Sequence, residues 1–429
     1  MPKNKGVLLS ALVACALMTG CKDDKKETVS IEFMHSSVEQ ERQAIIGKLI
    51  QRFEKENPGI TVKQVPVEED AYNTKITTLA RSGALPEVIE ISHDYAKVMD
   101  KEQLLDRDAV QSVITTLGEN AFYDGILRIV RTEDAKAWTG VPISAWIQGV
   151  WYKKSVLEKA GLQPPHDWQS LLSVASKLND PQHKKYGIAL PTAESVITEQ
   201  AFSQFALSNN ANVFDSNGAI TLNTPQMAEA LTFYQSLAKE TMPGSNNVME
   251  IKDAFMNGAA PMAIYSTYIL PAVYSEGDPK DLGFVVPNQT SPAVYGMITS
   301  LTLTAGQTDV ETDAAKKFVV FMEHAQNAAD WVLMSPGAAL PVIRAVSGTA
   351  SYQDNPVIKA FGDLPAQLIA QYPNMQAFGS VGDKNFSRMG DITGSGALNA
   401  MVNSVTVGNR DVQATLVQSQ KRIEELATH

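Results

Sequence analysis

The sequence predicts an α/β protein of more than one domain. Its 429 residues exceed the roughly 100 to 200 residues of an ordinary domain. Hydrophobic residues make up 44% of the chain and charged residues 19%, so the protein can bury a large interior. Short stretches with an alternating apolar pattern are followed by longer stretches with apolar residues three and four positions apart. This succession of strands and helices is typical of a sheet with parallel members.

The amino-terminal part of the chain shows the succession most clearly. Residues 29–34 alternate apolar and polar side chains, which predicts a first strand. A helix capped by Ser37 should follow and end at Asn57-Pro58-Gly59. We expect further strands over 60–67 and 87–91 and a helix over 70–81. Ligands of parallel sheets bind beyond the carboxyl ends of the strands, where this chain has two polar groups: His35-Ser36-Ser37 and Ser92-His93-Asp94.

Residues 138–172 combine aromatic side chains with residues that break regular structure. Four of the five tryptophans of the chain lie here, three of them within residues 138–151, and Gly140 and Pro142 interrupt both helix and strand patterns. Aromatic rings with few charges around them suit the wall of a cleft that binds a small ligand. Two ordinary helices should follow, the first capped by Ser155 and the second over 168–177.

The rest of the chain continues in the same manner and becomes helical toward its end. An apolar run covers 259–265, and expected strands cover 186–190, 282–286 and 297–304. Apolar periodicity predicts helices over 198–207, 225–239, 251–257, 311–323 and 412–426.

The amino terminus predicts export and a lipid anchor. Lys3 and Lys5 precede fifteen residues without charge, which are too few to span a bilayer of about 30 Å as a helix, so cleavage after export is expected. Met18-Thr19-Gly20-Cys21 resembles a bacterial lipoprotein box. Residues 1–20 would then be the signal peptide, Cys21 the lipidated residue, and 21–27 a tether to a membrane of the cell envelope. Cys15 is the alternative lipidation site, and an ordinary signal peptide is the alternative to lipidation.

Composition and motifs disfavour several other classes of function. The formal charge of −11 falls to about −13 without the two leader lysines, and no Lys/Arg cluster could follow a nucleic acid. If Cys21 carries lipid, no thiol remains for a disulfide or a metal, and the six histidines are scattered. We therefore expect neither metal nor cofactor. An exported glycoside hydrolase remains the rival class, although carboxylate pairs such as Glu68-Glu69 lie among other charges, as on a solvated face.

Six stretches, in order along residues 29–426, resemble a single protein family, the family 1 extracellular solute-binding proteins of bacterial ABC importers. They are RFEKENPGITV, RSGALPEVIEI, GVPISAWIQGVWYKKSVLEKAGLQPPHDW, AFMNGAAPMAI, AAKKFVVFM with ADWVLMSPGAALPV, and VTVGNRDVQATL. The resemblance implies two α/β lobes that close like a hinge on a solute in the cleft between them. It also implies a monomer that performs no covalent chemistry and delivers its solute to a membrane permease.

The resemblance places the lobes and the crossing between them on this chain. The first lobe would comprise residues 28–138 and 302–344, and the second residues 139–300 and 345–429. Gly140 and Pro142 would then mark the first crossover.

Most members of the family bind sugars, whose apolar faces stack on aromatic rings and whose hydroxyls need directional polar partners. Trp146 is the leading candidate because it follows the crossover, although a tryptophan in an apolar stretch is more often in a core. The other stacking candidates are Tyr265, Tyr268 and Tyr295. The candidates for hydrogen bonds are Ser36, Glu39, Tyr72, His93, Asp94, Ser266 and Asn385.

A glycerol-3-phosphate-binding subgroup offers a second interpretation. Tyr72, Ser266, Gly296 and Arg388 fall where that subgroup has solute contacts, and an arginine can grip a phosphate with two hydrogen bonds. His93, Trp146 and Ala338-Ala339 depart from the subgroup's pattern. The resemblance therefore favours a carbohydrate, with a polyol or a phosphorylated solute such as glycerol-3-phosphate as the alternative.

Overall fold

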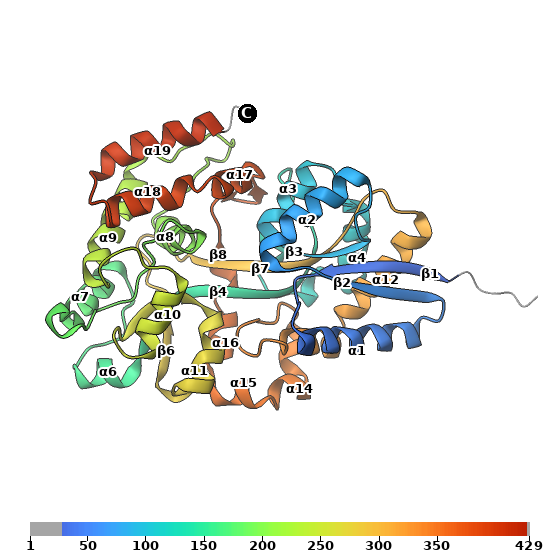
Figure 1. The fold of residues 1–429 in the computed structure, drawn as a ribbon, viewed down its shortest axis with the longest axis horizontal. Coiled ribbons are helices and arrows are strands. Elements are labelled where there is room, and N and C mark those ends of the chain that lie inside the picture. Colours follow the sequence, from blue (N-terminus) through green and yellow to red (C-terminus); the bar gives the residue numbers. More distant parts are fainter. Residues whose placement is uncertain (1–27, 427–429) are drawn as a thin grey trace, which may run out of the picture.

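The computed structural model describes residues 28–426, which form two α/β lobes side by side (Figure 1). Two long strands, β4 (Val141–Lys153) and β7 (Val294–Leu303), run between the lobes. A single mixed sheet passes through both, with the strand order β2-β1-β3-β7-β4-β5. The predicted α/β class and two-lobe architecture are therefore confirmed. The expected signal peptide, tether and lipidated Cys21 lie outside the described residues.

The first lobe holds the parallel strands that the alternation predicted. β1 (Val29–His35) lies between β2 (Ile60–Pro66) and β3 (Val88–Ser92) and pairs in parallel with both. Apolar residues on one face of α1 (Gln40–Glu56) are buried, as expected from their spacing. The other helices of this part are α2 (Glu69–Ser82), α3 (His93–Lys101), α4 (Arg107–Leu117), α5 (Ile126–Ile129), α12 (Asp309–Met322) and α13 (Ala325–Val332).

The crossing strands are antiparallel and packed closely together. β7 pairs with β3 on one side and with β4 on the other, so it joins the sheets of the two lobes. At the start of β4, a Cβ on Gly140 would stand 2.8 Å from the Cβ of Ser300 in β7. Only glycine fits at this crossing without a shift of the backbone.

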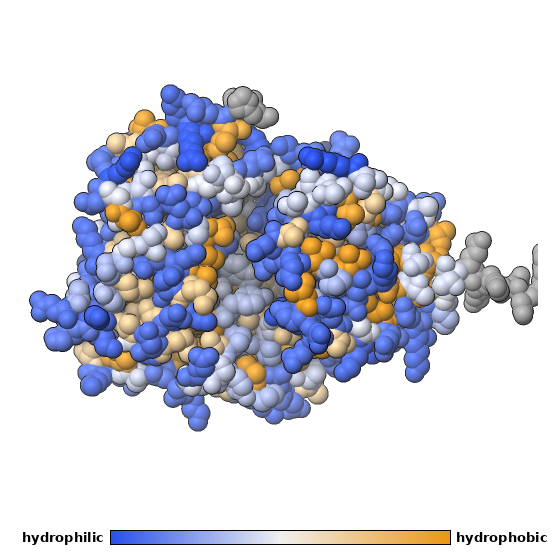
Figure 2. Space-filling view, viewed as in Figure 1, coloured by the Kyte–Doolittle hydropathy of each residue, from blue (hydrophilic) through white to orange (hydrophobic). Residues whose placement is uncertain are grey.

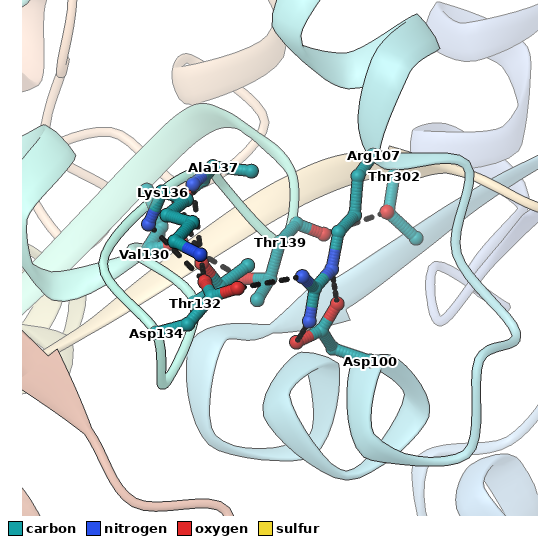
Figure 3. A network of polar contacts seen from close by, with 9 residues as sticks. All are labelled: Asp100, Arg107, Val130, Thr132, Asp134, Lys136, Ala137, Thr139 and Thr302. Carbon is teal, nitrogen blue, oxygen red and sulfur yellow. Dashed lines mark hydrogen bonds and ion pairs between the residues drawn. The ribbon is translucent and has the colours of Figure 1, made fainter.

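Polar contacts tie the segment before β4 to the first lobe (Figure 3). Arg107 at the start of α4 donates two hydrogen bonds to Asp100, at 2.6 and 2.7 Å, and one to Asp134, at 3.2 Å. The hydroxyl of Thr302 in β7 donates to the carbonyl of Thr139 at 2.7 Å. The chain is therefore fixed in position before it enters β4.

The second lobe surrounds the buried helix α8 (Val196–Ser208), which packs against α9 (Pro225–Leu237) and α18 (Ala397–Thr406). Its strands β5 (Met262–Ser266) and β6 (Leu282–Val285) pair with β4. Its remaining helices are α6 (Lys154–Lys159), α7 (Trp168–Leu178), α10 (Val248–Met256), α11 (Leu270–Glu276), α17 (Arg388–Gly394) and α19 (Val412–Leu426).

Short elements complete the chain. The segment after α13 carries α14 (Ala350–Gln353), α15 (Pro356–Ala360) and α16 (Leu364–Ile369). β8 (Met375–Gln376) pairs with β7, and β9 (Ser380–Val381) pairs with β10 (Lys384–Asn385). Single 3₁₀ turns cover Glu119–Ala121, Pro181–His183, Ala238–Glu240, Thr267–Ile269, Pro279–Asp281, Arg344–Gly348 and Tyr372–Asn374.

Two predicted helix caps are wrong. α1 begins three residues after Ser37 and has no side-chain cap. Ser155 lies inside α6, where its N–H and its hydroxyl donate to the carboxylate of Asp281 at 2.7 and 2.9 Å. That acceptor stands 126 residues away in the sequence, so local capping patterns do not reveal it.

The strand predicted over 186–190 is also wrong. Only Ala189 forms a bridge, to Ala263 of β5. A Cβ on Gly187 would lie 1.9 Å from the carbonyl oxygen of Ala175, so the segment runs against the backbone of α7. The amides of Gly187 and Ile188 donate to the carbonyl of Glu240, and only the amide of Ala189 donates to a strand, at Met262 of β5. This apolar segment is therefore buried without forming a β-strand.

Candidate functional site

A cleft with a volume of about 560 Å³ lies between the lobes. Figure 2 shows the hollow at the centre of the molecule, with the two lobes as its walls. Residues from the turn after β1, from α2 and from β3 line one side, residues from α8, α10 and β5 line the other, and the crossing strands form the floor. This volume is within the range of about 300–1,000 Å³ that is typical of sites for small molecules.

The floor of the cleft follows from the alternation of side chains along β4. Ser144, Trp146 and Gln148 line the cleft, whereas Ala145 and Ile147 between them belong to the core. The Trp146 ring lies 5.8 Å from the ring of the buried Tyr295, which holds it in place. Gln148 is 2% exposed, and its Nε2 has no hydrogen-bond partner among the described residues. The floor therefore offers an aromatic face beside an amide that has a free donor.

A carboxyl group at the end of β3 supports the wall of the first lobe. The N–H and the hydroxyl of Ser36 donate to Oε2 of Glu90, at 2.9 and 3.2 Å. Burial raises the pKa of the Glu90 carboxyl, while the hydrogen bonds from Ser36 and the charge of Arg42 lower it. The Tyr72 hydroxyl lies 3.0 Å from the carbonyl oxygen of Met34 and 2.8 Å from that of Glu90, so the fold already uses its donor.

Charged groups in the cleft are predominantly acidic. Glu69 and Glu90 supply two carboxyl groups, and Arg42 is the single cationic side chain among the lining residues. The guanidinium of Arg42 donates to the hydroxyl of Ser335 at 2.7 Å. A doubly negative solute would therefore meet one arginine, the carboxyl group of Glu69 and the buried Glu90 carboxyl, whose pKa is raised by burial.

The wall of the second lobe is aromatic and partly exposed. Tyr265 and Ser266 end β5, and Tyr268 follows in the next turn. Tyr268 is 46% exposed and Val196, at the start of α8, is 44% exposed. Movement of the first lobe toward this wall would remove apolar surface from water.

Seven predicted site residues lie outside this cleft. The side chain of Glu39 is 58% exposed and its carboxylate is 3.8 Å from Arg42. His93, Asp94 and Tyr295 line a separate, small cavity of about 40 Å³. Six other predicted residues do line the cleft: Trp146, Tyr72, Ser36, Tyr265, Ser266 and Tyr268.

The last three of the seven are held by contacts within the fold. Gly296 lies in β7 where a Cβ would stand 2.7 Å from the carbonyl oxygen of Trp146. The Asn385 amide donates to the carbonyls of Arg128 and Arg131 at 3.1 and 2.9 Å.

Arg388, which suggested a phosphorylated solute, donates to the carbonyl of Gly218. Its guanidinium stacks 5.3 Å from the centre of the Phe214 ring. Both partners lie outside the cleft, so this arginine is not available to a phosphate there.

The prediction from sequence missed several residues that line the cleft. Ser144 and Gln148 could have been found from their spacing. They stand two residues before and after Trp146 in one strand, so their side chains lie on the same face as that of Trp146. The other cleft residues that were missed include Arg42, Glu90, Gln200, Thr299 and Trp331. They are distant in the sequence, and only the fold brings them together.

Among residues 28–426, no three or more His, Cys, Asp or Glu side chains are grouped in a way that could hold a metal ion. None of the helices there combines the length and the apolar character that a membrane span requires.

Comparison with known proteins gives a consistent family relationship. The family model for the bacterial extracellular solute-binding protein matches residues 36–329. The putative ABC transporter periplasmic-binding protein YcjN of Escherichia coli (strain K12) is 71% identical over 426 residues, which cover 99% of each chain. A multiple sugar-binding protein of Streptococcus mutans is 23% identical over 74% of this chain and 77% of that protein.

Solved structures share the fold at lower identity. The sugar-binding protein MalE from the phytopathogen Xanthomonas citri superposes with a TM-score of 0.76 and 18% identity, and the match covers 93% of this chain and 97% of that one. A mannitol-bound solute-binding protein from Agrobacterium vitis S4 superposes with a TM-score of 0.68 and 23% identity, over 94% and 98%. The chain therefore belongs to the bacterial extracellular solute-binding protein family.

Proposed function

We propose that this protein captures an uncharged carbohydrate or polyol in the cleft between its lobes and delivers it to an ABC permease. The observation that carries the proposal is the row of Ser144, Trp146 and Gln148 along β4. It places an aromatic ring between a hydroxyl and a free amide donor, and a sugar presents a flat apolar face bordered by hydroxyls. The names of the relatives, which include sugar-binding and mannitol-binding proteins, agree with this solute class.

The charge of the cleft favours an uncharged solute over a phosphorylated one. Glu69 and Glu90 outnumber Arg42 among the lining residues, and Arg388 is occupied by Gly218 and Phe214. A phosphate usually requires several donors or cations around it. Glycerol-3-phosphate, the alternative raised by the sequence, is therefore the less favoured solute.

Binding would be coupled to closure of the lobes. Val196 and Tyr268 present exposed apolar surface to the cleft, and a ligand that touches both lobes is held best when that surface is covered. No step of this cycle makes or breaks a covalent bond. The protein would act as a monomeric receptor rather than as an enzyme.

The proposed location follows from the leader and the family. Export, cleavage before Cys21 and lipidation of that cysteine would hold the protein at a membrane of the cell envelope, with residues 21–27 as the tether. Mass spectrometry of the protein isolated from bacterial membranes tests this part. A diacylglycerol on a chain that begins at residue 21 is expected, and a chain without lipid would refute the anchor.

A thermal-shift screen of the purified protein with sugars, polyols and their phosphates tests the solute class. A saturable rise of Tm with an unphosphorylated sugar or polyol is expected, since a ligand that binds only the folded state stabilises it. A larger rise with the phosphorylated forms would refute the proposed class. Turnover of glycosides would refute the receptor role.

Substitution of Trp146 tests the site. Trp146→Ala should weaken binding by about 1 kcal/mol or more through lost stacking, which isothermal titration can measure. Tyr274→Ala is the matched control, because Tyr274 is an exposed aromatic residue of α11 outside the cleft. An unchanged dissociation constant in Trp146→Ala would place the ligand elsewhere.

A further inference from the structure

A second group of ionisable side chains lies where the two lobes touch beside the cleft. α3 of the first lobe packs against α17 of the second, and α8 lies close by. A Cβ on Gly390 of α17 would stand 2.7 Å from a methyl group of Val98 in α3, so these helices are in close contact. At the edge of the contact, Lys101 and Asp391 form an ion pair at 3.8 Å.

Glu199 of α8 points into the small cavity at this contact. Its side chain is buried, Oε1 accepts a hydrogen bond from the Thr393 hydroxyl at 2.6 Å, and Oε2 has no partner among the described residues. Asp94, at the start of α3, lines the same cavity of about 40 Å³ from the other lobe. Burial and the negative charge of Asp94 raise the pKa of Glu199 to about 7.

The other ionisable groups around the cavity do not change their main protonation state near neutral pH. Burial lowers the pKa of His93 to about 3, and its Nδ1 accepts a hydrogen bond from the N–H of Ile298 at 3.1 Å, so it stays neutral. Burial lowers the pKa of Lys97 to about 8, which leaves it mostly charged at pH 7. Burial raises the pKa of the Tyr295 hydroxyl well above its usual range. Arg388 of α17 is occupied outside the cavity by Gly218.

We propose that closure of the lobes is linked to protons: Glu199 takes up a proton when α3 brings Asp94 over it, so acid favours the closed state. This inference rests on the hinge movement of the proposed function and concerns its regulation. Glu199 is buried, and Asp94, although exposed, lines the same small cavity from the other lobe, so a charge on Glu199 is costly while Asp94 is charged. A proton on Oε2 of Glu199 removes the repulsion, because the unpartnered oxygen then belongs to an uncharged carboxylic acid.

The direction of the pH dependence follows from the two states of Glu199. In open lobes, water reaches the carboxyl, which returns toward its ordinary pKa near 4.5. With α3 packed against α17, as in this structure, the pKa of Glu199 is about 7, so formation of this contact between the lobes takes up a proton between these values. The closed state is then most favoured at low pH and loses this advantage as pH rises through 7. Lys97 acts in the opposite direction only above pH 8, where closure favours its neutral form.

Small-angle X-ray scattering of the purified, ligand-free protein between pH 5 and pH 8 tests the proposal. The radius of gyration should increase with pH, with a midpoint between pH 6 and pH 7. Glu199→Gln, which keeps the uncharged form, should hold the smaller radius at every pH. Asp94→Asn should move the midpoint to lower pH, because it removes the like charge from the other lobe. As no ligand is present, the outcome is independent of the solute class.

Glu323→Gln is the matched control, since Glu323 is an equally buried carboxyl at the end of α12, away from the contact between the lobes. It should leave the scattering profile of the natural protein unchanged. A radius that is constant with pH, or a pH dependence that persists in Glu199→Gln, would overturn the proposal. If Glu199→Gln fails to fold, the exposed Asp94→Asn variant still decides, and an unshifted midpoint there would equally overturn it.

Discussion

Replacement of Gln148 by leucine should weaken ligand binding without weakening the fold. The side chain is 2% exposed and its Nε2 has no hydrogen-bond partner among the described residues, so unfolding allows this donor to bind water. A buried donor left unpaired costs about 1–3 kcal/mol. Gln148→Leu has a similar volume and removes this donor. The free energy of unfolding should therefore stay the same or rise by about 1 kcal/mol.

The same substitution should have the opposite effect on affinity. A ligand hydroxyl that accepts from Nε2 in the closed cleft would face leucine and lose that bond. The loss is about 1–3 kcal/mol, or roughly 5-fold to 150-fold in the dissociation constant. Calorimetric titration with the solute found in the screen measures the affinity, and urea unfolding of the ligand-free protein measures the stability.

Gln235→Leu is the control for these opposite effects on stability and affinity. The Nε2 of Gln235 donates to the carbonyl of Val405 at 2.9 Å, within the second lobe and outside the cleft. This variant should lose about 1 kcal/mol of stability and keep its affinity. If Gln148→Leu instead loses stability and binds as tightly as the natural protein, the amide has a structural partner and does not face the ligand.

Three further predictions concern the frame around the cleft. Arg107→Ala should destabilise the protein by about 1–2 kcal/mol in urea unfolding, because it leaves the buried Asp100 without its two hydrogen bonds, although the arginine itself is partly exposed; no change would mean that the network does not hold the crossing. Gly140→Ala should lower Tm, because its Cβ would lie 2.8 Å from that of Ser300, and an unchanged Tm would show that the strands move apart freely. Burial raises the pKa of Glu323 well above its usual range, so its contribution to stability falls as pH rises; Glu323→Gln should raise Tm more at pH 8 than at pH 4, and an equal gain at both would refute this reasoning.

The secondary structure was predictable where local chemistry decides it. The parallel strands β1, β2 and β3 and the helix over 412–426 follow from apolar periodicity, and α7 begins at Trp168, where the helix over 168–177 was expected. Two of the failures involve a partner elsewhere in the sequence. Asp281 accepts the hydrogen bonds of Ser155, and residues 186–190 run against the backbone of α7 and reach the sheet only through the bridge at Ala189.

The cleft was predictable only in part for the same reason. Trp146 was identified because Gly140 and Pro142 marked a crossing, and six of the predicted residues line the cleft. The sequence could not tell which way Arg388 points, since its partners Gly218 and Phe214 lie about 170 residues away. Both walls come from segments that only the fold brings together, so Glu90 and Gln200 carried no local signal.

The position of the candidate site on β4 connects binding with movement. β4 carries Trp146 on the cleft floor and Gln148 two residues further on, and Gly140 directly precedes this strand at the crossing. β4 pairs with β7 along this length, and β7 also pairs with β3 of the first lobe. In the proposed closure, a ligand on Trp146 would rest on the strands that bend or twist as the lobes approach each other. Because both lobes are joined to that floor, contact between the ligand and either wall would favour the same closed arrangement. The crossing strands themselves would then link binding to closure.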